Sequence, residues 1–248
     1  MANQHDWLIQ PFAHRGLHAP DLGIIENTSS AFQAALNAGY GIELDVRTAG
    51  DGEVIVFHDA TLNRLTTATG KISAHTTGQL RMVTFRNSGD RIQTLAELLE
   101  QVNGRVPLLI EIKTDWINHG PCERGVAACL ESYNGPAAVM SFDPNSVAVF
   151  ALEFPGITRG IIADRYKHTH SRQGLSWWQR FYMRHLLSAF IAKPHFVNYD
   201  VRALPSLAPL IWKHVMHRPL LTWTVRSSEQ ALHARRWADD IVFENFQP

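Results

Sequence analysis

The sequence contains few cysteines and no long apolar run, and each absence excludes a class of protein. Its 248 residues include only Cys122 and Cys129, separated by six residues in a segment that is typical of a helix. Helical rise would place their Cα atoms about 10 Å apart, too far for a disulfide, and no further Cys supports a zinc site. No apolar run approaches the roughly 20 residues of a membrane span. The polar segment Met1–Asp6 lacks the basic start and apolar stretch of a signal peptide, so we expect a cytoplasmic protein.

The chain also lacks an excess of charge of either sign. Lys and Arg together number 23, as do Asp and Glu, and the formal net charge is zero. This balance provides no bulk attraction to nucleic acid or to an anionic membrane, so we expect no nucleic-acid partner and no stable membrane insertion. The apolar content of 45% is that of an ordinary globular protein, and the length suits one α/β barrel domain.

Short apolar runs rich in β-branched and aromatic residues alternate with segments of helical period. The strand candidates are Trp7–Ala13, Gly41–Val46, Pro107–Lys113, Ala137–Ser141, Thr158–Ala163, Phe196–Val201, Leu220–Val225 and Ile241–Glu244. The helix candidates are Ser29–Ala38, Leu95–Val102, Cys122–Tyr133, Asn145–Glu153, Ser176–Ala192, Pro205–Val215 and Ser228–Trp237. Eight strands with intervening helices predict parallel crossover units, and their number favours an α/β fold of the (β/α)8 (TIM) barrel type over an open sheet.

One long excursion interrupts this alternation. Between Arg47 and Gln93 the chain has its own short apolar run, Val54-Ile55-Val56-Phe57, after an Asp51-Gly52 turn, which predicts a hairpin. We therefore expect a single domain over residues 1–248, with an insertion subdomain at about 47–93 after the second strand. Active sites of this fold lie on the side where the strands end.

Four short clusters of chemically active residues fall in or just after strand-like runs. They are His14-Arg15-Gly16, Glu43-x-Asp45, His58-Asp59 and Glu111-x-Lys113. Residues i and i+2 of a strand point to the same face, so Glu43 and Asp45 project together, and Glu111 is expected to join them from the next strand. Three carboxylates that close need a counter-charge, and oxygen ligands without Cys predict Mg²⁺ or Ca²⁺ rather than zinc. For one acidic pair alone, rim salt bridges would be the better interpretation.

Two histidines flank this predicted metal site. His14 ends the first strand and His58 ends the hairpin strand. Because imidazole titrates near neutral pH, one of them can accept a proton while the other donates one. Asp59 either orients His58 or caps the following turn.

The cations of the clusters suit a phosphate group. Arg15 offers a planar fork of donors and Lys113 offers a point charge, although an ion pair with Glu111 is a rival role for Lys113. Glu26-Asn27-Thr28 precedes a helix and is typical of a capping segment; contact of Glu26 with substrate hydroxyls is the weaker alternative.

The segment Ser176–Ala192 is rich in aromatic residues. Its apolar face carries Trp177, Trp178, Phe181, Tyr182, Leu186, Leu187 and Phe190, opposite a stripe of Arg180, Arg184 and Ser188. An apolar face this wide is typical of a helix that packs on a barrel, which is the interpretation we favour. The alternatives are an interfacial helix that approaches lipid and an oligomer contact.

Taken in order, these residues resemble the motifs of the glycerophosphodiester phosphodiesterases, a family of phospholipase-C-like phosphodiesterase barrels. The matching elements are His14-Arg15-Gly16, Glu26-Asn27-Thr28, Glu43-Leu44-Asp45, Asp51-Gly52, His58-Asp59 and Glu111-Ile112-Lys113. The match is close over residues 12–113 and looser in the C-terminal third. There, Arg226 and Glu244 depart from the family pattern at the catalytic rim, which leaves the choice of head group open.

The resemblance implies a barrel enzyme with a bound Mg²⁺ or Ca²⁺. On that pattern Glu43, Asp45 and Glu111 are metal ligands, His14 and His58 are the acid–base pair, and Arg15 and Lys113 hold the phosphate. We expect hydrolysis of small glycerophosphodiesters to glycerol 3-phosphate and an alcohol. The alternatives are a lysophospholipase-D-like or cyclising enzyme of the same superfamily, and a barrel that binds phosphorylated ligands without catalysis. The oligomeric state is not predicted.

Overall fold

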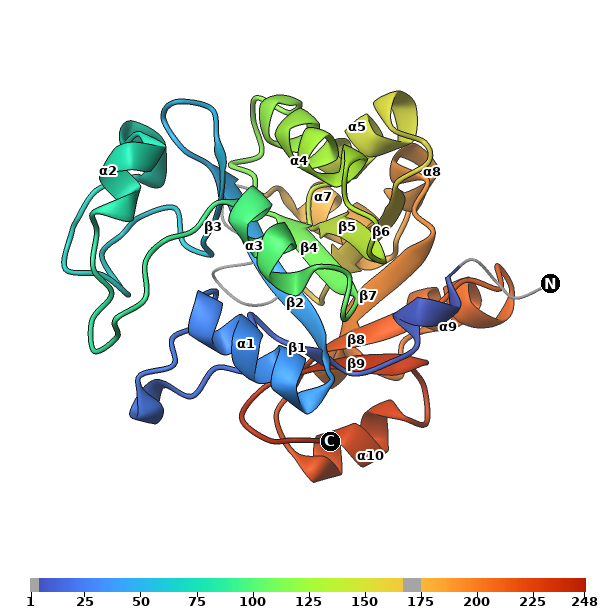
Figure 1. Ribbon diagram of the computed structural model, residues 1–248. Coiled ribbons are helices and arrows are strands. Elements are labelled where there is room, and N and C mark those ends of the chain that lie inside the picture. Colours follow the sequence, from blue (N-terminus) through green and yellow to red (C-terminus); the bar gives the residue numbers. More distant parts are fainter. Residues whose placement is uncertain (1–4, 167–174) are drawn as a thin grey trace. The chain divides into compact units, whose positions relative to one another are not determined.

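The structure is a computed structural model that describes residues 5–166 and 175–248 (Figure 1). It divides into two compact units, which we describe separately. The N-terminal unit comprises Phe12–Ala138, and the C-terminal unit comprises Met1–Pro11 and Val139–Pro248. The first four residues of the polar N-terminal segment lie outside the described residues. Within the described ranges, no helix combines the length and the apolar character that crossing a bilayer requires.

The strands of the N-terminal unit form a mainly parallel sheet. They are β1 (Phe12–Ala13), β2 (Gly41–Thr48), β3 (Val54–Val56) and β4 (Leu108–Ile112). β2 pairs in parallel with β1 and with β4, whereas β3 runs antiparallel to β2 and forms the predicted hairpin. β2 and β4 are apolar apart from Glu43, Asp45, Arg47, Thr48 and Glu111, and β4 is buried along its whole length, as expected for strands covered on both faces.

Helices connect the strands of this unit, and capping residues in the sequence fix where some of these helices begin. They are α1 (Ser29–Ala38), α2 (Thr77–Arg81), α3 (Leu95–Val102) and α4 (Pro121–Glu131), with 3₁₀ turns at Pro20–Leu22 and Ile72–Ala74. Thr28 is the N-cap of α1, as its sequence predicts, and Thr94 forms a capping box with Glu97 at the start of α3. The two Cys residues lie in α4 and are free.

The excursion after β2 has a small apolar core of its own. Its buried side chains are Ile55, Phe57, Leu62, Ile72, Leu80, Phe85 and Ile92, with Ile25 and Ala49 beside them. Figure 1 shows α2 and the loops around it standing away from β2 and β4. The backbone N–H of Phe57 donates to the Asp45 carbonyl at 2.9 Å, so the hairpin is fastened to β2 directly at the acidic cluster.

The C-terminal unit contains four parallel strands that pair in sequence order. These are β6 (Thr158–Ala163), β7 (Phe196–Asp200), β8 (Leu220–Val225) and β9 (Asp240–Phe243), and β5 (Ala137–Ser141) spans the boundary between the units. The helices are α5 (Pro144–Glu153), α7 (Trp177–Arg184), α8 (Ala189–Ala192), α9 (Leu207–His214) and α10 (Ser228–Ala234), with 3₁₀ turns at Asp6–Leu8 and Val201–Ala203. An apolar cluster that includes Ile161, Val197, Tyr199 and Leu220 packs beneath these helices.

Three sequence predictions are wrong in whole or in part. The expected strand Trp7–Ala13 is a 3₁₀ turn followed by a strand of only two residues, because Pro11 lacks an N–H and has a fixed φ. The expected helix Ser176–Ala192 is divided into α7 and α8, and Leu186 between them adopts a left-handed φ of 56°. The favoured packing of its apolar face is found for Leu186, which is buried, but is wrong for Trp177, Trp178, Phe181 and Phe190, which are exposed.

Candidate active site

Three acidic side chains meet on one face of β2 and β4, and strand geometry explains why. Glu43 and Asp45 are two residues apart on β2 and share one face. The parallel register pairs Asp45 directly with Glu111 on β4, so Glu111 joins the same face. Carboxylate oxygens of all three lie within 4.8 Å of one another, and the residues are only 1%, 0% and 6% exposed, respectively.

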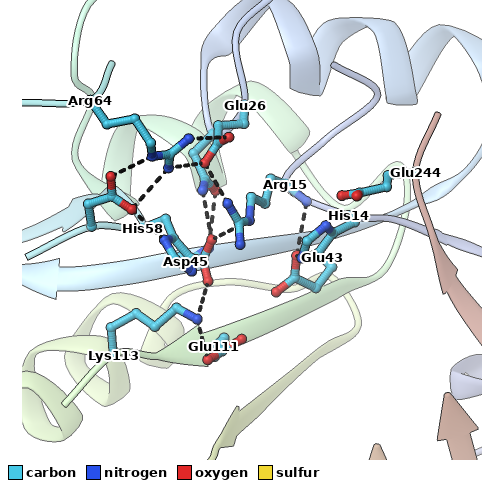
Figure 2. A network of polar contacts seen from close by, with 12 residues as sticks. His14, Arg15, Glu26, Glu43, Asp45, His58, Arg64, Glu111, Lys113 and Glu244 are labelled. Carbon is cyan, nitrogen blue, oxygen red and sulfur yellow. Dashed lines mark hydrogen bonds and ion pairs between the residues drawn. The ribbon is translucent and has the colours of Figure 1, made fainter. Parts of the chain in front are cut away.

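Lys113 supplies a positive charge to this acidic cluster. Its ammonium lies 2.5 Å from Glu111 Oε1 and 3.0 Å from Asp45 Oδ1, between the two carboxylates (Figure 2). Lys113 follows Glu111 by two residues, so both project to the same face where β4 ends. The ion pair that rivalled a phosphate role for Lys113 is therefore present, and it includes Asp45 as well as Glu111.

Asp45 is the most strongly held of the three acids. Asn27 Nδ2 donates to its Oδ2 at 2.8 Å, and the Asp45 backbone N–H donates to Asn27 Oδ1 at 3.1 Å. Burial opposes ionisation of this carboxyl, but the charges of Lys113, His58 and Arg15 outweigh it and hold the pKa of Asp45 well below its usual range. The sequence predicted Asn27 only as part of a capping segment, so these two hydrogen bonds to Asp45 were not predicted.

Glu43 lies in a different electrostatic environment. Burial, together with the negative charges of Asp45 and Glu111, raises the pKa of Glu43 well above its usual range, although Lys113 opposes this shift. The backbone N–H of Arg15 donates to Glu43 Oε2 at 2.9 Å. His14 Nε2 lies 3.9 Å from the same oxygen, so the first predicted imidazole borders the cluster.

A tight turn after β1 places His14 and Arg15 beside β2. Arg15 and Gly16 both adopt left-handed backbone angles, with φ of 57° and 78°. A Cβ on residue 16 would lie 2.9 Å from the carbonyl carbon and Cβ of Ala31, so only glycine fits here. The Gly16 N–H also donates to the Glu43 carbonyl at 3.2 Å, which fixes the turn against β2.

The second imidazole is oriented by its neighbour. His58 Nδ1 lies 2.7 Å from Asp59 Oδ1, so of the two roles proposed for Asp59, the structure shows the one that orients His58. Despite partial burial, hydrogen bonds from His58 and Arg64 hold the pKa of Asp59 well below its usual range. An ionised Asp59 can only accept, so Nδ1 carries the proton in this contact and Nε2 of neutral His58 is left as a base.

Arg64 and Glu26 extend this arrangement into a network that the sequence did not predict. Arg64 donates to both oxygens of Asp59 and both oxygens of Glu26, at 2.6–2.9 Å. Arg15 donates to Glu26 Oε1 at 2.6 Å, so the two guanidinium groups share this carboxylate (Figure 2). Although partial burial opposes ionisation, these two arginines lower the pKa of Glu26 to about 2.

The acidic cluster fits a hard divalent cation. Oxygens within 4.8 Å of one another can share one ion at ligand distances of about 2.0–2.6 Å. Asp45 Oδ1 is buried and makes no hydrogen bond within the described chain; Lys113 lies close enough for an ion pair, but the geometry is not that of a hydrogen bond. A buried carboxylate oxygen that is ion-paired but makes no hydrogen bond within the described chain can serve as a metal ligand, and an all-oxygen donor set suits Mg²⁺ and Ca²⁺ alike.

Comparison with solved structures identifies the fold. A phosphodiesterase from Oleispira antarctica, solved in complex with its product sn-glycerol-3-phosphate, is similar to 95% of this chain over 92% of its own length. The TM-score is 0.76 and the sequence identity is 21%. The chain is therefore a (β/α)8 barrel protein, as its sequence predicts, and it carries an acidic cluster that can hold a metal ion.

Sequence comparison identifies the family. The model of the glycerophosphoryl diester phosphodiesterase family matches residues 14–246, and the chain belongs to this family. A glycerophosphodiester phosphodiesterase from Caldanaerobacter subterraneus subsp. tengcongensis is 32% identical over 130 residues, which cover 49% of this chain and 52% of that protein. One from Bacillus altitudinis is 33% identical over 162 residues, covering 61% and 65%. The chain thus matches about half to two thirds of the length of these relatives.

Proposed function

We propose that this protein hydrolyses glycerophosphodiesters to glycerol 3-phosphate and an alcohol in a metal-dependent reaction. The observation that carries the proposal is the meeting of Glu43, Asp45 and Glu111 within 4.8 Å, with His14 at its border. The family supports the substrate class, because the matched relatives are named glycerophosphodiester phosphodiesterases. The product complex of the Oleispira protein supports a small-molecule substrate.

Glu43, Asp45 and Glu111 would hold the metal ion, which we propose to be Mg²⁺ or Ca²⁺. When bound, such an ion polarises a phosphoryl oxygen and offsets charge that develops in the transition state. The sheet holds the three acids in place. Asp45 and Glu111 are register partners on β2 and β4, and Glu43 shares the strand face of Asp45.

Arg15 and Lys113 would bind the phosphate group. The Lys113 ammonium has three donors and two carboxylate neighbours, so a further N–H can donate to a phosphoryl oxygen. The Arg15 guanidinium has five donors, and its contacts to Glu26 and Asp45 hold its plane while leaving donors for the substrate. Both cations therefore keep their charge and orientation before substrate arrives.

His14 and His58 would move the protons of the reaction. One imidazole takes a proton from the attacking oxygen, which belongs to water or to a hydroxyl of the substrate, and the other gives a proton to the departing alcohol. Asp59 supports a base role for His58 by keeping the proton on Nδ1. His14 lies beside Glu43, on the opposite side of the network in Figure 2 from His58.

A metal-titrated assay tests the proposed function. Glycerol 3-phosphate release from glycerophosphocholine and glycerophosphoethanolamine is measured after treatment with EDTA and after addition of Mg²⁺ or Ca²⁺. We expect loss of turnover with EDTA and recovery with one of the ions. Full activity in excess EDTA, or ligand-induced stabilisation without turnover in either metal, would contradict a metal-dependent hydrolase. Turnover of lysophospholipids alone would favour the lysophospholipase-D-like alternative.

Histidine variants test the acid–base pair in the same assay. His14→Ala and His58→Ala should each lower kcat by about 10²–10⁴-fold, the usual contribution of a general acid or base. His214→Ala is the matched control, because His214 is exposed at the end of α9. A loss of less than tenfold in either variant removes that residue from the mechanism.

A further inference from the structure

The two short helices α7 and α8 present large apolar side chains to solvent. Trp177, Trp178 and Phe181 of α7 are 57%, 63% and 46% exposed, and Phe190 and Ile191 of α8 are 79% and 52% exposed. The Trp177 and Trp178 rings stack at 3.7 Å, so they form one aromatic surface. Exposed aromatic residues gathered on consecutive elements mark an interaction surface rather than ordinary surface variation.

Other side chains of α7, of α8 and of the residues between them are buried in the core. Met183, Leu186 and Ala192 belong to the buried apolar cluster of the C-terminal unit, together with Ile161, Val197 and Tyr199. The Tyr199 hydroxyl also donates to the Arg184 carbonyl at 3.0 Å. The helices are therefore anchored by other side chains, and neither their tryptophans nor Phe190 belong to that buried cluster.

The charge on this segment has one sign. Between Leu175 and Tyr199 the sequence contains Arg180, Arg184 and Lys193 but no Asp or Glu. The whole chain is neutral, so this local excess of three positive charges contrasts with the rest of the protein. Tryptophan and phenylalanine combined with Arg and Lys are the residues that suit the boundary between lipid tails and anionic head groups.

We propose that α7 and α8 dock the protein on the surface of an anionic lipid bilayer, with Trp177, Trp178 and Phe190 inserted among the head groups. The helices lie in the interface and do not span the bilayer, because α7 has only eight residues and α8 only four. The docking surface needs no substrate and stands independently of the proposed reaction.

Charge also favours a bilayer over a second copy of the chain. A two-fold dimer would place this patch against itself, with Arg180, Arg184 and Lys193 facing the same three cations of the other copy. Such like-charge juxtaposition opposes association, and the cores of dimer interfaces are depleted in charged residues. An anionic bilayer complements both the aromatic and the basic part of the patch.

Co-sedimentation of the full chain with vesicles, without substrate, tests the proposal. The vesicles contain phosphatidylcholine alone or with one quarter phosphatidylglycerol. We expect binding to the anionic vesicles that weakens as salt is added. Trp177→Ala/Trp178→Ala should lower the partition coefficient at least about tenfold through lost apolar contact. Arg180→Gln/Arg184→Gln should lower it about tenfold or more on anionic vesicles.

Leu152→Ala/Leu232→Ala is the matched control, because these exposed apolar residues lie on α5 and α10. It should bind like the unmodified protein, and an unchanged melting temperature of each variant excludes misfolding. Equal binding by the tryptophan variant, or no preference for anionic vesicles, would overturn the proposal. So would a dimer in sedimentation equilibrium that the tryptophan variant abolishes, because the patch would then be a contact between copies.

Discussion

Arg64 connects two parts of the candidate site through a single side chain. Its planar fork bonds Asp59, which orients His58, and Glu26, which orients Arg15. Lysine has no equivalent of this double bidentate contact, because its ammonium is a point charge. We expect Arg64 to act as a positioning residue that couples the insertion to the turn after β1.

Arg64→Ala and Arg64→Lys test this role. Removing the fork frees Asp59 and Glu26 to move, so His58 and Arg15 lose their fixed orientation. We expect kcat for glycerophosphodiester hydrolysis to fall about tenfold or more, as is usual when the partners that orient reactive groups are lost. KM should change less than kcat, and Lys should recover only part of the loss.

Arg81→Ala is the control for this experiment. Arg81 also donates to a glutamate, Glu97, at 2.6 Å, but both partners are largely exposed. A surface ion pair of this kind contributes only about 0–1 kcal/mol, so kcat should stay within twofold. If Arg64→Ala turned over substrate as fast as Arg81→Ala, the positioning role would be ruled out.

At the scale of residues, sequence periodicity predicted the acidic cluster but not the network around it. The spacing of Glu43 and Asp45, and of Glu111 and Lys113, fixes their shared faces through local strand geometry. Arg64 and Glu26 are 38 positions apart, and no local period relates them. Only the fold of the excursion brings them together. The one hint in the sequence was the position of Arg64 shortly after His58-Asp59.

At the scale of elements, turn and cap residues were good predictors of the hairpin turn and the helix start. Apolar runs were poorer predictors of how long a strand or helix is. The Asp51-Gly52 hairpin and the Thr28 cap of α1 follow from local chemistry. Trp7–Ala13 is an apolar run that tertiary context and Pro11 limit to a two-residue strand. The break between α7 and α8 contains no Gly or Pro, and Leu186 enters the left-handed region while its side chain is buried in the core.

β6 offers a test of packing between neighbouring strands. Gly160 is the register partner of Phe196 on β7, and a Cβ at position 160 would lie 2.3 Å from the Phe196 ring. This ring is fully buried, so the close packing of the core limits how far it can move away. Gly160→Ala should therefore lower the free energy of unfolding by about 1–3 kcal/mol, the usual cost of overpacking a core. Denaturant titration measures the change.

Gly156→Ala is the matched control in the turn before β6. No atom lies within 4 Å of a Cβ at this position, and its φ is not in the left-handed region. The free energy of unfolding should stay the same or rise slightly, because alanine reduces the freedom of the unfolded chain. Equal effects of the two substitutions would show that the Phe196 contact relaxes at no cost.

At the scale of the whole molecule, the count and order of elements were sufficient to predict the barrel. Alternation of short apolar runs with helical segments limits the topology to parallel crossover units, and eight such runs select the (β/α)8 arrangement. Errors in one strand and one helix did not change that outcome, because the fold depends on the order of elements more than on their exact bounds. The structural likeness and the family match confirm the fold and the family.

Metal binding should also be visible in the stability of the whole molecule. An ion that binds the folded state alone stabilises it by about 2.7 kcal/mol at a hundred times its Kd, which corresponds to a rise in Tm of about 5–10 °C for a chain of this size. We expect this rise with Mg²⁺ or Ca²⁺ after EDTA treatment. Glu111→Gln should lose most of it, because an amide oxygen replaces one of three buried carboxylates.

The comparison rests on the shift that metal produces in each variant, since Glu111→Gln also alters the contact with Lys113 and therefore the starting Tm. Glu229→Gln, at an exposed position in the first turn of α10, should keep the full rise. Equal metal-induced shifts in both variants would place the ion somewhere other than between β2 and β4. The acidic cluster would then be a set of buried ion pairs neutralised by Lys113 and Arg15, and the metal-dependent mechanism would lose its physical basis.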